Sequence, residues 1–118
     1  MSSEVRAIIR WVPASRGGRN HPPTPAVGYS APARFESDPD ESRGTWSLRL
    51  LEAAELHGPE VISARLAFLA PNAPSELLVE GERFELMEGR KVVAKGVVLP
   101  ASTQIPANIN PFELALLG

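Results

Sequence analysis

The chain has 118 residues, of which 43% are hydrophobic and 22% are charged, a composition typical of one globular domain with a modest core. Its net charge of −2 and its pI near 5.7 disfavour general RNA or DNA binding through a global positive field. The absence of cysteine excludes disulfides and thiolate chemistry. No apolar run approaches the roughly 18 residues that span a bilayer, so we expect a soluble cytoplasmic protein.

Short alternating runs at the start of the chain predict strands separated by a long loop. Residues 4–12 place apolar side chains on one face and two arginines on the other. Residues 13–28 contain four prolines and three glycines, which is too many for continuous pairing in a sheet. Residues 29–35 resume the alternation, and Pro32 predicts a bulge or a sheet edge there because it donates no ladder hydrogen bond.

The middle of the chain predicts two more strands. Residues 36–44 have no apolar side chain, and we expect an exposed, mobile loop. In this loop Asp38, Asp40 and Glu41 favour a solvated acidic loop over a metal site. Strands follow at 45–51 and 60–69. Between them, residues 50–57 contain strong helix formers, so this segment could form either a short helix or a turn.

The last predicted strands form a hairpin. A two-residue turn at Glu88-Gly89 would place Lys91 opposite Leu86 and disrupt the apolar face. A turn of three or five residues instead pairs Leu86 with Val92 and Phe84 with Ala94. We predict this odd-numbered turn, with Gly89 in an unusual backbone conformation. Gly96 indicates a bulge or bend in the last strand.

Together the alternating runs predict an all-β fold. The six strands are 4–12, 29–35, 45–51, 60–69, 83–87 and 91–99. Each has one apolar face, and a closed antiparallel six-stranded β-barrel buries all of these faces most simply, with a two-sheet sandwich as the alternative. We assign residues 1–99 to this barrel. Residues 100–118 form a C-terminal tail, with a short helix starting near Asn110-Pro111, that packs on the barrel or on a partner.

Short motifs at both ends of the predicted barrel share one family pattern. They are Gly17-Gly18-Arg19 with His21, Gly28-Tyr29 with Pro32, Arg83-Phe84, Glu88-Gly89 and Gly96-Val97-Val98. Over about residues 4–99 they resemble the C-terminal β-barrel domain, domain 3, of elongation factor Tu, here without its GTPase. Asn20 is inserted relative to that pattern, and Arg90 stands where the family has glycine.

The resemblance implies contact positions. In the family this barrel packs on a second barrel, touches the GTPase domain and contacts the T-stem of tRNA. Carried over residue by residue, the contact positions are Arg19, His21, Glu88 and Gly89. Gly17-Gly18 is not followed by the Lys-Ser/Thr of a phosphate loop, so we expect no GTP binding by this chain. We predict instead a tight turn at these glycines that lets Arg19 reach back across the end of the barrel.

The basic side chains predict a docking patch independently of the family. Arg16, Arg19, Arg83, Arg90, Lys91 and Lys95 come from two loops and one hairpin, and several of them would share one surface. The ligand would be an acidic protein surface or an RNA stem, and the acidic pI disfavours RNA and tRNA. The two histidines sit far apart beside loop signals, and no nucleophile or metal motif accompanies them.

We therefore expect a non-catalytic binding module without a cofactor or a bound metal. Contact with a partner protein, or self-association, is its first predicted role, and an RNA- or tRNA-binding accessory of translation is the alternative. Self-association would use the leucines of the tail and the outward apolar side chains of the barrel, namely Ile8, Val12, Leu51 and Val97; we expect a dimer or, as the alternative, a tail folded over this patch.

Overall fold

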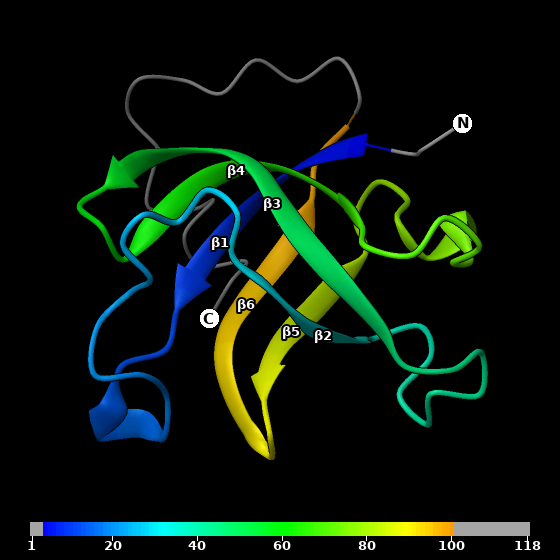
Figure 1. Cartoon of the computed structure of the whole chain (residues 1–118), viewed down its shortest axis with the longest axis horizontal. Coiled ribbons are helices and arrows are strands. Elements are labelled where there is room, and N and C mark those ends of the chain that lie inside the picture. Colours follow the sequence, from blue (N-terminus) through cyan, green and yellow to red (C-terminus); the bar gives the residue numbers. More distant parts are fainter. Residues whose placement is uncertain (1–3, 101–118) are drawn as a thin grey trace.

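The computed structural model describes residues 4–100, which form a closed antiparallel barrel (Figure 1). Its strands are β1 (Glu4–Trp11), β2 (Ser30–Phe35), β3 (Trp46–His57), β4 (Val61–Phe68), β5 (Arg83–Glu88) and β6 (Lys91–Val98). Around the barrel the order is β1-β4-β3-β2-β5-β6, and β6 pairs with β1 to close it. Single-turn 3-10 helices η1 (Ala14–Arg16) and η2 (Ser75–Leu77) lie in the connections. The predicted six-stranded closed barrel is confirmed.

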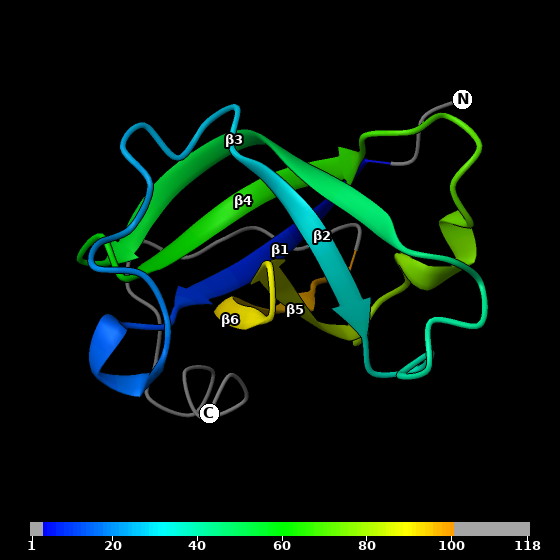
Figure 2. The same ribbon diagram turned by 60° about the horizontal axis from the view of Figure 1, so that its bottom comes forward.

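All six strands contribute side chains to one core inside the barrel. Trp11 of β1 and Phe84 of β5 belong to it, although they are far apart in the sequence. Figure 2 shows β3 and β4 arching over β5 and β6, so the core lies between these two walls. The largest side chains that are less than 2% exposed are Ile9, Leu48, Leu50, Leu66, Leu86 and Val93. Full burial of one such side chain contributes about 1.5–3 kcal/mol.

β3 continues to His57, so the helix or turn left open for residues 50–57 is not formed. These residues pair with β4 instead, with register shifts after Leu50 and after Glu55. Backbone pairing and burial against a neighbouring strand outweigh the helix propensity of the segment. The β3–β4 hairpin is consequently longer than the sequence predicts.

The acidic loop after β2 is held by hydrogen bonds within itself. Asp38 accepts from the backbone N–H of Ser42 at 3.1 Å and from that of Arg43 at 3.0 Å, and from the Ser42 hydroxyl at 2.5 Å. These bonds, the Ser42 hydroxyl above all, lower the pKa of Asp38. The predicted exposure of residues 36–44 is wrong at Asp38, which is 9% exposed, whereas most of the other residues of the loop are exposed.

The predicted odd-numbered turn between β5 and β6 is wrong. Glu88 pairs with Lys91, so the turn is the two-residue Gly89-Arg90, and Gly89 has the predicted positive φ of 62°. Leu86 lies opposite Ala94, two residues further along than predicted.

A bulge in β6 explains this register. The pairing shifts between Leu86 and Met87, where Val93 is the extra residue on the opposite strand. Val93 and Ala94 are both 0% exposed. Because the bulge changes the alternation by one residue, a two-residue turn is compatible with an inward Leu86. The predicted irregularity in the last strand therefore lies at Val93 and not at Gly96.

Gly96 has a different role, which is to leave room for an aromatic ring. It pairs with Phe84, and a Cβ atom at Gly96 would lie 2.3 Å from the Phe84 Cζ atom. Backbone at this position therefore forms part of the wall against which the Phe84 ring packs.

No helix in residues 4–100 is long and apolar enough to cross a membrane. The predictions for the C-terminal tail, including the helix near Asn110-Pro111, fall on residues 101–118, outside the described part of the chain.

Substitution of Gly96 by alanine tests the contact with Phe84. We expect Gly96→Ala to lower the free energy of unfolding by about 1–3 kcal/mol, because the methyl group overpacks the core. In a Phe84→Leu background the smaller side chain accommodates the methyl group, and the cost should shrink. Urea denaturation of the four proteins gives the coupling energy. An equal cost of Gly96→Ala in both backgrounds would contradict this account.

Candidate binding groove at one end of the barrel

The loop that follows β1 folds back onto the end of that strand. Gly18 donates its N–H to the Pro13 carbonyl at 2.9 Å, and Arg19 donates its N–H to the Val12 carbonyl at 3.0 Å. A Cβ atom at Gly18 would lie 1.8 Å from the Val12 carbonyl oxygen, so only glycine allows this approach. The close turn brings Arg19 to the end of the barrel, as the sequence predicts.

Arg19 joins a cluster with Tyr29 and Glu88 that ties the loop to the β5–β6 hairpin. The Arg19 guanidinium forms an ion pair with Glu88. The Tyr29 hydroxyl donates to Glu88 Oε2 at 2.5 Å, and the guanidinium carbon lies 5.6 Å from the centre of the Tyr29 ring. Trp11 meets the same ring edge-on, with 5.4 Å between the ring centres. Three chain segments are therefore held together at this end of the barrel.

Both acids of this cluster have shifted pKa values. Burial raises the pKa of Tyr29 well above its ordinary 10.0, and the hydrogen bond and charge of Glu88 raise it further. The hydrogen bond from Tyr29 lowers the pKa of Glu88, and Arg19 lowers it further. At neutral pH the cluster accordingly holds a neutral phenol, a carboxylate and a guanidinium. Glu88 therefore neutralises the positive charge of Arg19 within the cluster.

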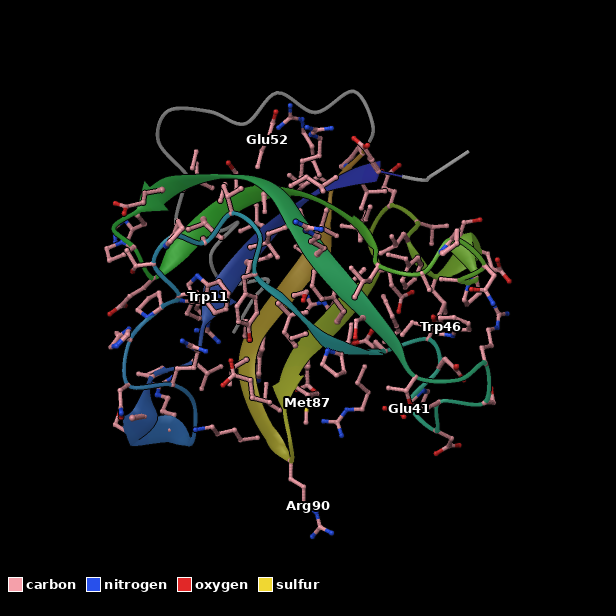
Figure 3. The ribbon with its side chains drawn as sticks, viewed as in Figure 1. Trp11, Glu41, Trp46, Glu52, Met87 and Arg90 are labelled. Carbon is pink, nitrogen blue, oxygen red and sulfur yellow. The ribbon has the colours of Figure 1, made fainter. Side chains whose placement is uncertain are left out.

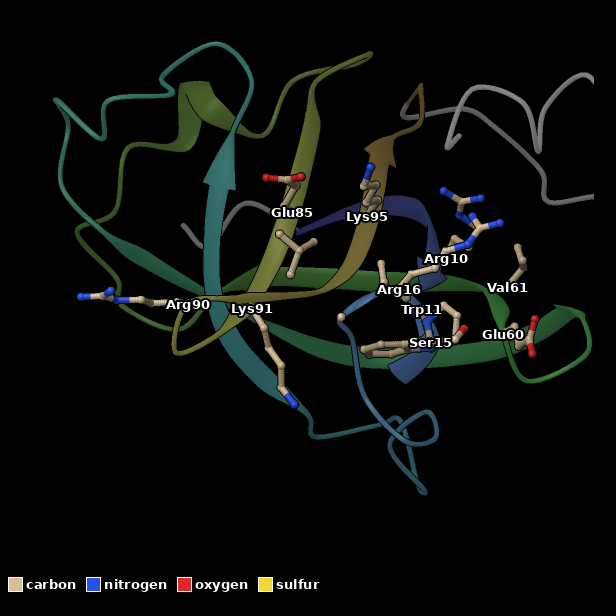
Figure 4. Close-up of a pocket in the computed structure, with 14 residues that line it drawn as sticks. Arg10, Trp11, Ser15, Arg16, Glu60, Val61, Glu85, Arg90, Lys91 and Lys95 are labelled. Atoms are coloured by element: carbon tan, nitrogen blue, oxygen red, sulfur yellow. The ribbon is translucent and has the colours of Figure 1, made fainter.

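A groove of about 890 Å³ lies beside this cluster (Figure 4). Its walls come from the end of β1, the loop through η1, the start of β4, and the β5–β6 hairpin. Val12, Pro13, Val61 and Val92 provide apolar lining. The charged lining consists of Arg10, Arg16, Arg90, Lys91 and Lys95, with Glu60 and Glu85.

The charges of the groove are not balanced by its own carboxylates. Glu85 forms an ion pair with Arg34, which lies outside the groove, and the Arg34 Nε donates to it at 3.0 Å. Among residues 4–100, Arg16, Arg90 and Lys95 form no ion pair. Cationic side chains therefore outnumber the carboxylates that neutralise them, which makes the groove suited to an anionic ligand.

Four of the residues predicted as binding positions line the groove, namely Arg16, Arg90, Lys91 and Lys95. Arg16 lies in η1, and Lys91 begins β6. Arg90 sits at the hairpin tip, and its side chain extends beyond the tip and away from the other cations (Figure 3; Figure 4). Arg90 is thus on the rim of the groove, where it reaches toward solvent.

The four contact positions that the family resemblance implies have structural roles in the described chain, and Arg83 of the predicted patch does not line the groove. Arg19 and Glu88 are engaged with each other, and Gly89 forms the turn. His21 is exposed; its Nδ1 lies 3.1 Å from the Pro22 carbonyl oxygen, and its own carbonyl oxygen accepts from the Arg19 Nε at 3.0 Å. These residues position the loop and the hairpin that form the groove, and they do not line it.

The predicted set of binding positions includes Lys95 but omits Arg10, which lines the groove from the neighbouring strand. Arg10 pairs with Lys95 across the β1–β6 ladder. The alternation of residues 4–12 marks Arg10 as outward, but only the register of the closing strands shows that it lies beside Lys95. Tyr29 is also absent from that set, since its partner Glu88 is 59 residues away in the chain.

Comparison with protein-family models and with curated proteins finds no match to this chain. The resemblance to the elongation factor Tu barrel therefore stays a prediction.

Titration of Tyr29 tests the cluster directly, because the chain contains one tyrosine and its phenolate absorbance reports that residue alone. We expect the midpoint to lie above 10.0, the ordinary value. Since the native state holds this proton more tightly than the unfolded chain, the stability it contributes is complete below about pH 10 and is lost as the pH rises through the native pKa.

Glu88→Gln should lower that midpoint only in part, because it removes the carboxylate charge but leaves Tyr29 buried. Glu80→Gln is the matched control, since Glu80 is exposed and lies outside the cluster. A wild-type midpoint near 10.0, or equal shifts in the two variants, would contradict the geometry described.

Proposed function

We propose that this chain is a non-catalytic β-barrel binding module that docks an acidic segment of a partner protein in the groove beside η1. The observation that carries the proposal is the convergence of cationic side chains from β1, η1 and the β5–β6 hairpin on one groove. The Arg19–Tyr29–Glu88 cluster supports it, because it holds the loop after η1 against the β5–β6 hairpin in the absence of a ligand. A preorganised site loses less free energy on binding than one that must be ordered.

The lining of the groove favours a protein ligand over RNA. The lining contains apolar side chains as well as cations, which suits a peptide that carries both carboxylates and aliphatic groups. Single-stranded RNA is usually held by bases stacked on exposed aromatic rings. The aromatic residue of this groove, Trp11, is 4% exposed, and Tyr29 beside it is bound to Glu88. Glu60 and the overall charge of −2 would also repel a phosphate backbone.

The non-catalytic part of the proposal is supported by how the described side chains are arranged. His21 lies in the loop after η1 and His57 ends β3, and both are exposed. Within residues 4–100, no group of three or more His, Asp or Glu side chains could hold a metal ion. The titratable groups with shifted pKa values are engaged in structural hydrogen bonds and ion pairs.

Descent from the C-terminal barrel of elongation factor Tu, and a cytoplasmic location, belong to the same proposal. The Gly17-Gly18-Arg19 and Glu88-Gly89 motifs support this descent, since they meet at the end of the barrel through the Arg19–Glu88 ion pair. The competing role is an RNA- or tRNA-binding accessory of translation, to which the cations of the groove would also contribute.

Reversal of two groove charges tests the proposal. A synthetic peptide of alternating glutamate and valine, titrated into the isotope-labelled full chain, should perturb amide resonances around Val12 and Val92. Lys91→Glu combined with Lys95→Glu should weaken this binding at least about tenfold, which corresponds to about 1.4 kcal/mol. Added salt should weaken the binding of the wild-type chain.

The matched control reverses charges outside the groove. Arg49→Glu and Arg83→Glu together make the same change in net charge at exposed positions of β3 and β5 that do not line the groove. Equal loss of binding in both double variants would show a general charge effect and contradict a specific groove. An RNA stem-loop that binds more tightly than the peptide, in a salt-sensitive manner, and perturbs the same resonances would identify RNA, and not a protein, as the ligand.

A further inference from the structure

A row of uncharged side chains crosses the outer surface of the barrel. In the strand register Val97 of β6 lies beside Ile8 of β1, Ile8 beside Ser63 of β4, and Ser63 beside Ala54 of β3. The neighbours of Ile8 and Ser63 along their strands point into the core, so alternation directs this row outward. We call the row, together with Val61, Leu56 and Leu99, the outer stripe; Ile8, Val61 and Val97 form a cluster separate from the barrel core, with Leu56 and Leu99 against it.

Several side chains of the outer stripe are nearly inaccessible, although they face away from the core. The exposed fractions are 5% for Ile8 and Val61, 7% for Ser63 and 9% for Val97. A side chain on the outer face of a sheet stays accessible unless another segment lies over it. The strands beneath cannot provide that cover, and Leu56 and Leu99 are themselves only partly buried. The part of the outer stripe on β6, β1 and β4 therefore requires a covering segment, whereas Ala54 on β3 is exposed.

Charged rows border the outer stripe on both sides. Arg6 pairs with Arg65 on one side, and Arg10 pairs with Lys95 on the other. Arg65 is matched by ion pairs with Glu4 and Glu52. Basic residues on both borders favour a covering segment that is apolar and carries few charges, none of them positive.

We propose that residues 101–118 of the same chain cover the outer stripe. The described chain ends directly beside it, because the Leu99 N–H donates to the Arg6 carbonyl at 2.8 Å. The segment has no basic residue, and its one charged side chain is Glu113. Its large apolar residues are Ile105, Ile109, Phe112, Leu114, Leu116 and Leu117. This inference does not depend on the ligand of the groove, although the outer stripe adjoins the groove and Val61 belongs to both.

The lengths involved permit this arrangement. Strands in a sheet lie about 4.8 Å apart, so a row across four strands spans roughly 15 Å. Eighteen residues reach up to about 60 Å when extended, at about 3.3–3.6 Å per residue. The segment can therefore leave β6, cross β1 and β4, and turn back. Because it is tethered beside the stripe, its effective concentration there is high.

A second copy of the chain fits the outer stripe less well. A stable interface between proteins buries about 800 Å² on each partner, contributed by about 20–30 residues. The outer stripe is one row of side chains with three more beside it, and charged rows border it. It is wide enough for a single segment and too narrow for the face of another barrel.

A spin label on the full-length chain tests the proposal. The sequence has no cysteine, so Ala115→Cys provides a single labelling position. In the isotope-labelled protein we expect the label to broaden the amide resonances of Ile8, Ser63 and Val97, and chemical reduction of the label should restore them. Sharp resonances along the whole outer stripe would overturn the proposal.

A mixed sample separates the same chain from a second copy. Spin-labelled chains without isotopes are combined with isotope-labelled chains without a spin label. Broadening should be absent from this mixture if the covering segment belongs to the same molecule. Broadening of the outer stripe in the mixture, equal to that of the doubly labelled chain, would assign the cover to another copy and overturn the proposal.

Substitutions in the full-length chain give a second readout. Val97→Lys introduces a charge into the outer stripe and should abolish the broadening at Ile8 and Ser63. Leu69→Lys is the matched control, because Leu69 is 55% exposed and lies outside the stripe. Leu117→Lys changes only the covering segment. It therefore tests the contact with the outer stripe even if Val97→Lys unfolds the barrel. Unchanged broadening in Leu117→Lys and Val97→Lys would contradict the contact.

Discussion

The pairing of the first strand with the last is the constraint on which the rest of this structure depends. β1 and β6 form one ladder from Ala7 and Val98 to Trp11 and Ala94, and this ladder turns a curved sheet into a closed barrel. A closed barrel has no exposed edge strands along its circumference, which removes a common route to aggregation. Closure also places the loop after β1 beside the β5–β6 hairpin, and the candidate groove lies between these two segments.

The cluster of Arg19, Tyr29 and Glu88 then sets the relative positions of these segments. Glu88 is engaged by both partners, so it does not neutralise the cations that line the groove. The side chains of Arg19 and Glu88 remain 25% and 33% exposed, and water screens much of their attraction. Their main contribution is positional, because the guanidinium also stacks on a ring that Trp11 holds in place.

Several features could be predicted from the sequence because they depend on neighbouring residues. Alternation identified the inward side of β1, and glycine with proline separated the strands. The approach of Arg19 to the barrel end followed from the Gly17-Gly18 turn. The hairpin register could not be predicted in this way, since the bulge at Val93 is stabilised by packing inside the finished barrel. The strand at residues 50–57 was ambiguous because pairing with β4 competes with local helix propensity.

The sequence alone indicated one all-β domain, with a closed barrel favoured over a two-sheet sandwich, and a basic character at the loop after β1 and at the last hairpin. Periodicity and turn residues are local properties, and they carry that information directly. Only the tertiary structure decided which cations share the groove and which are matched by carboxylates. Arg10 meets Lys95, and Arg19 meets Glu88, because closure of the barrel brings together residues that are far apart along the chain.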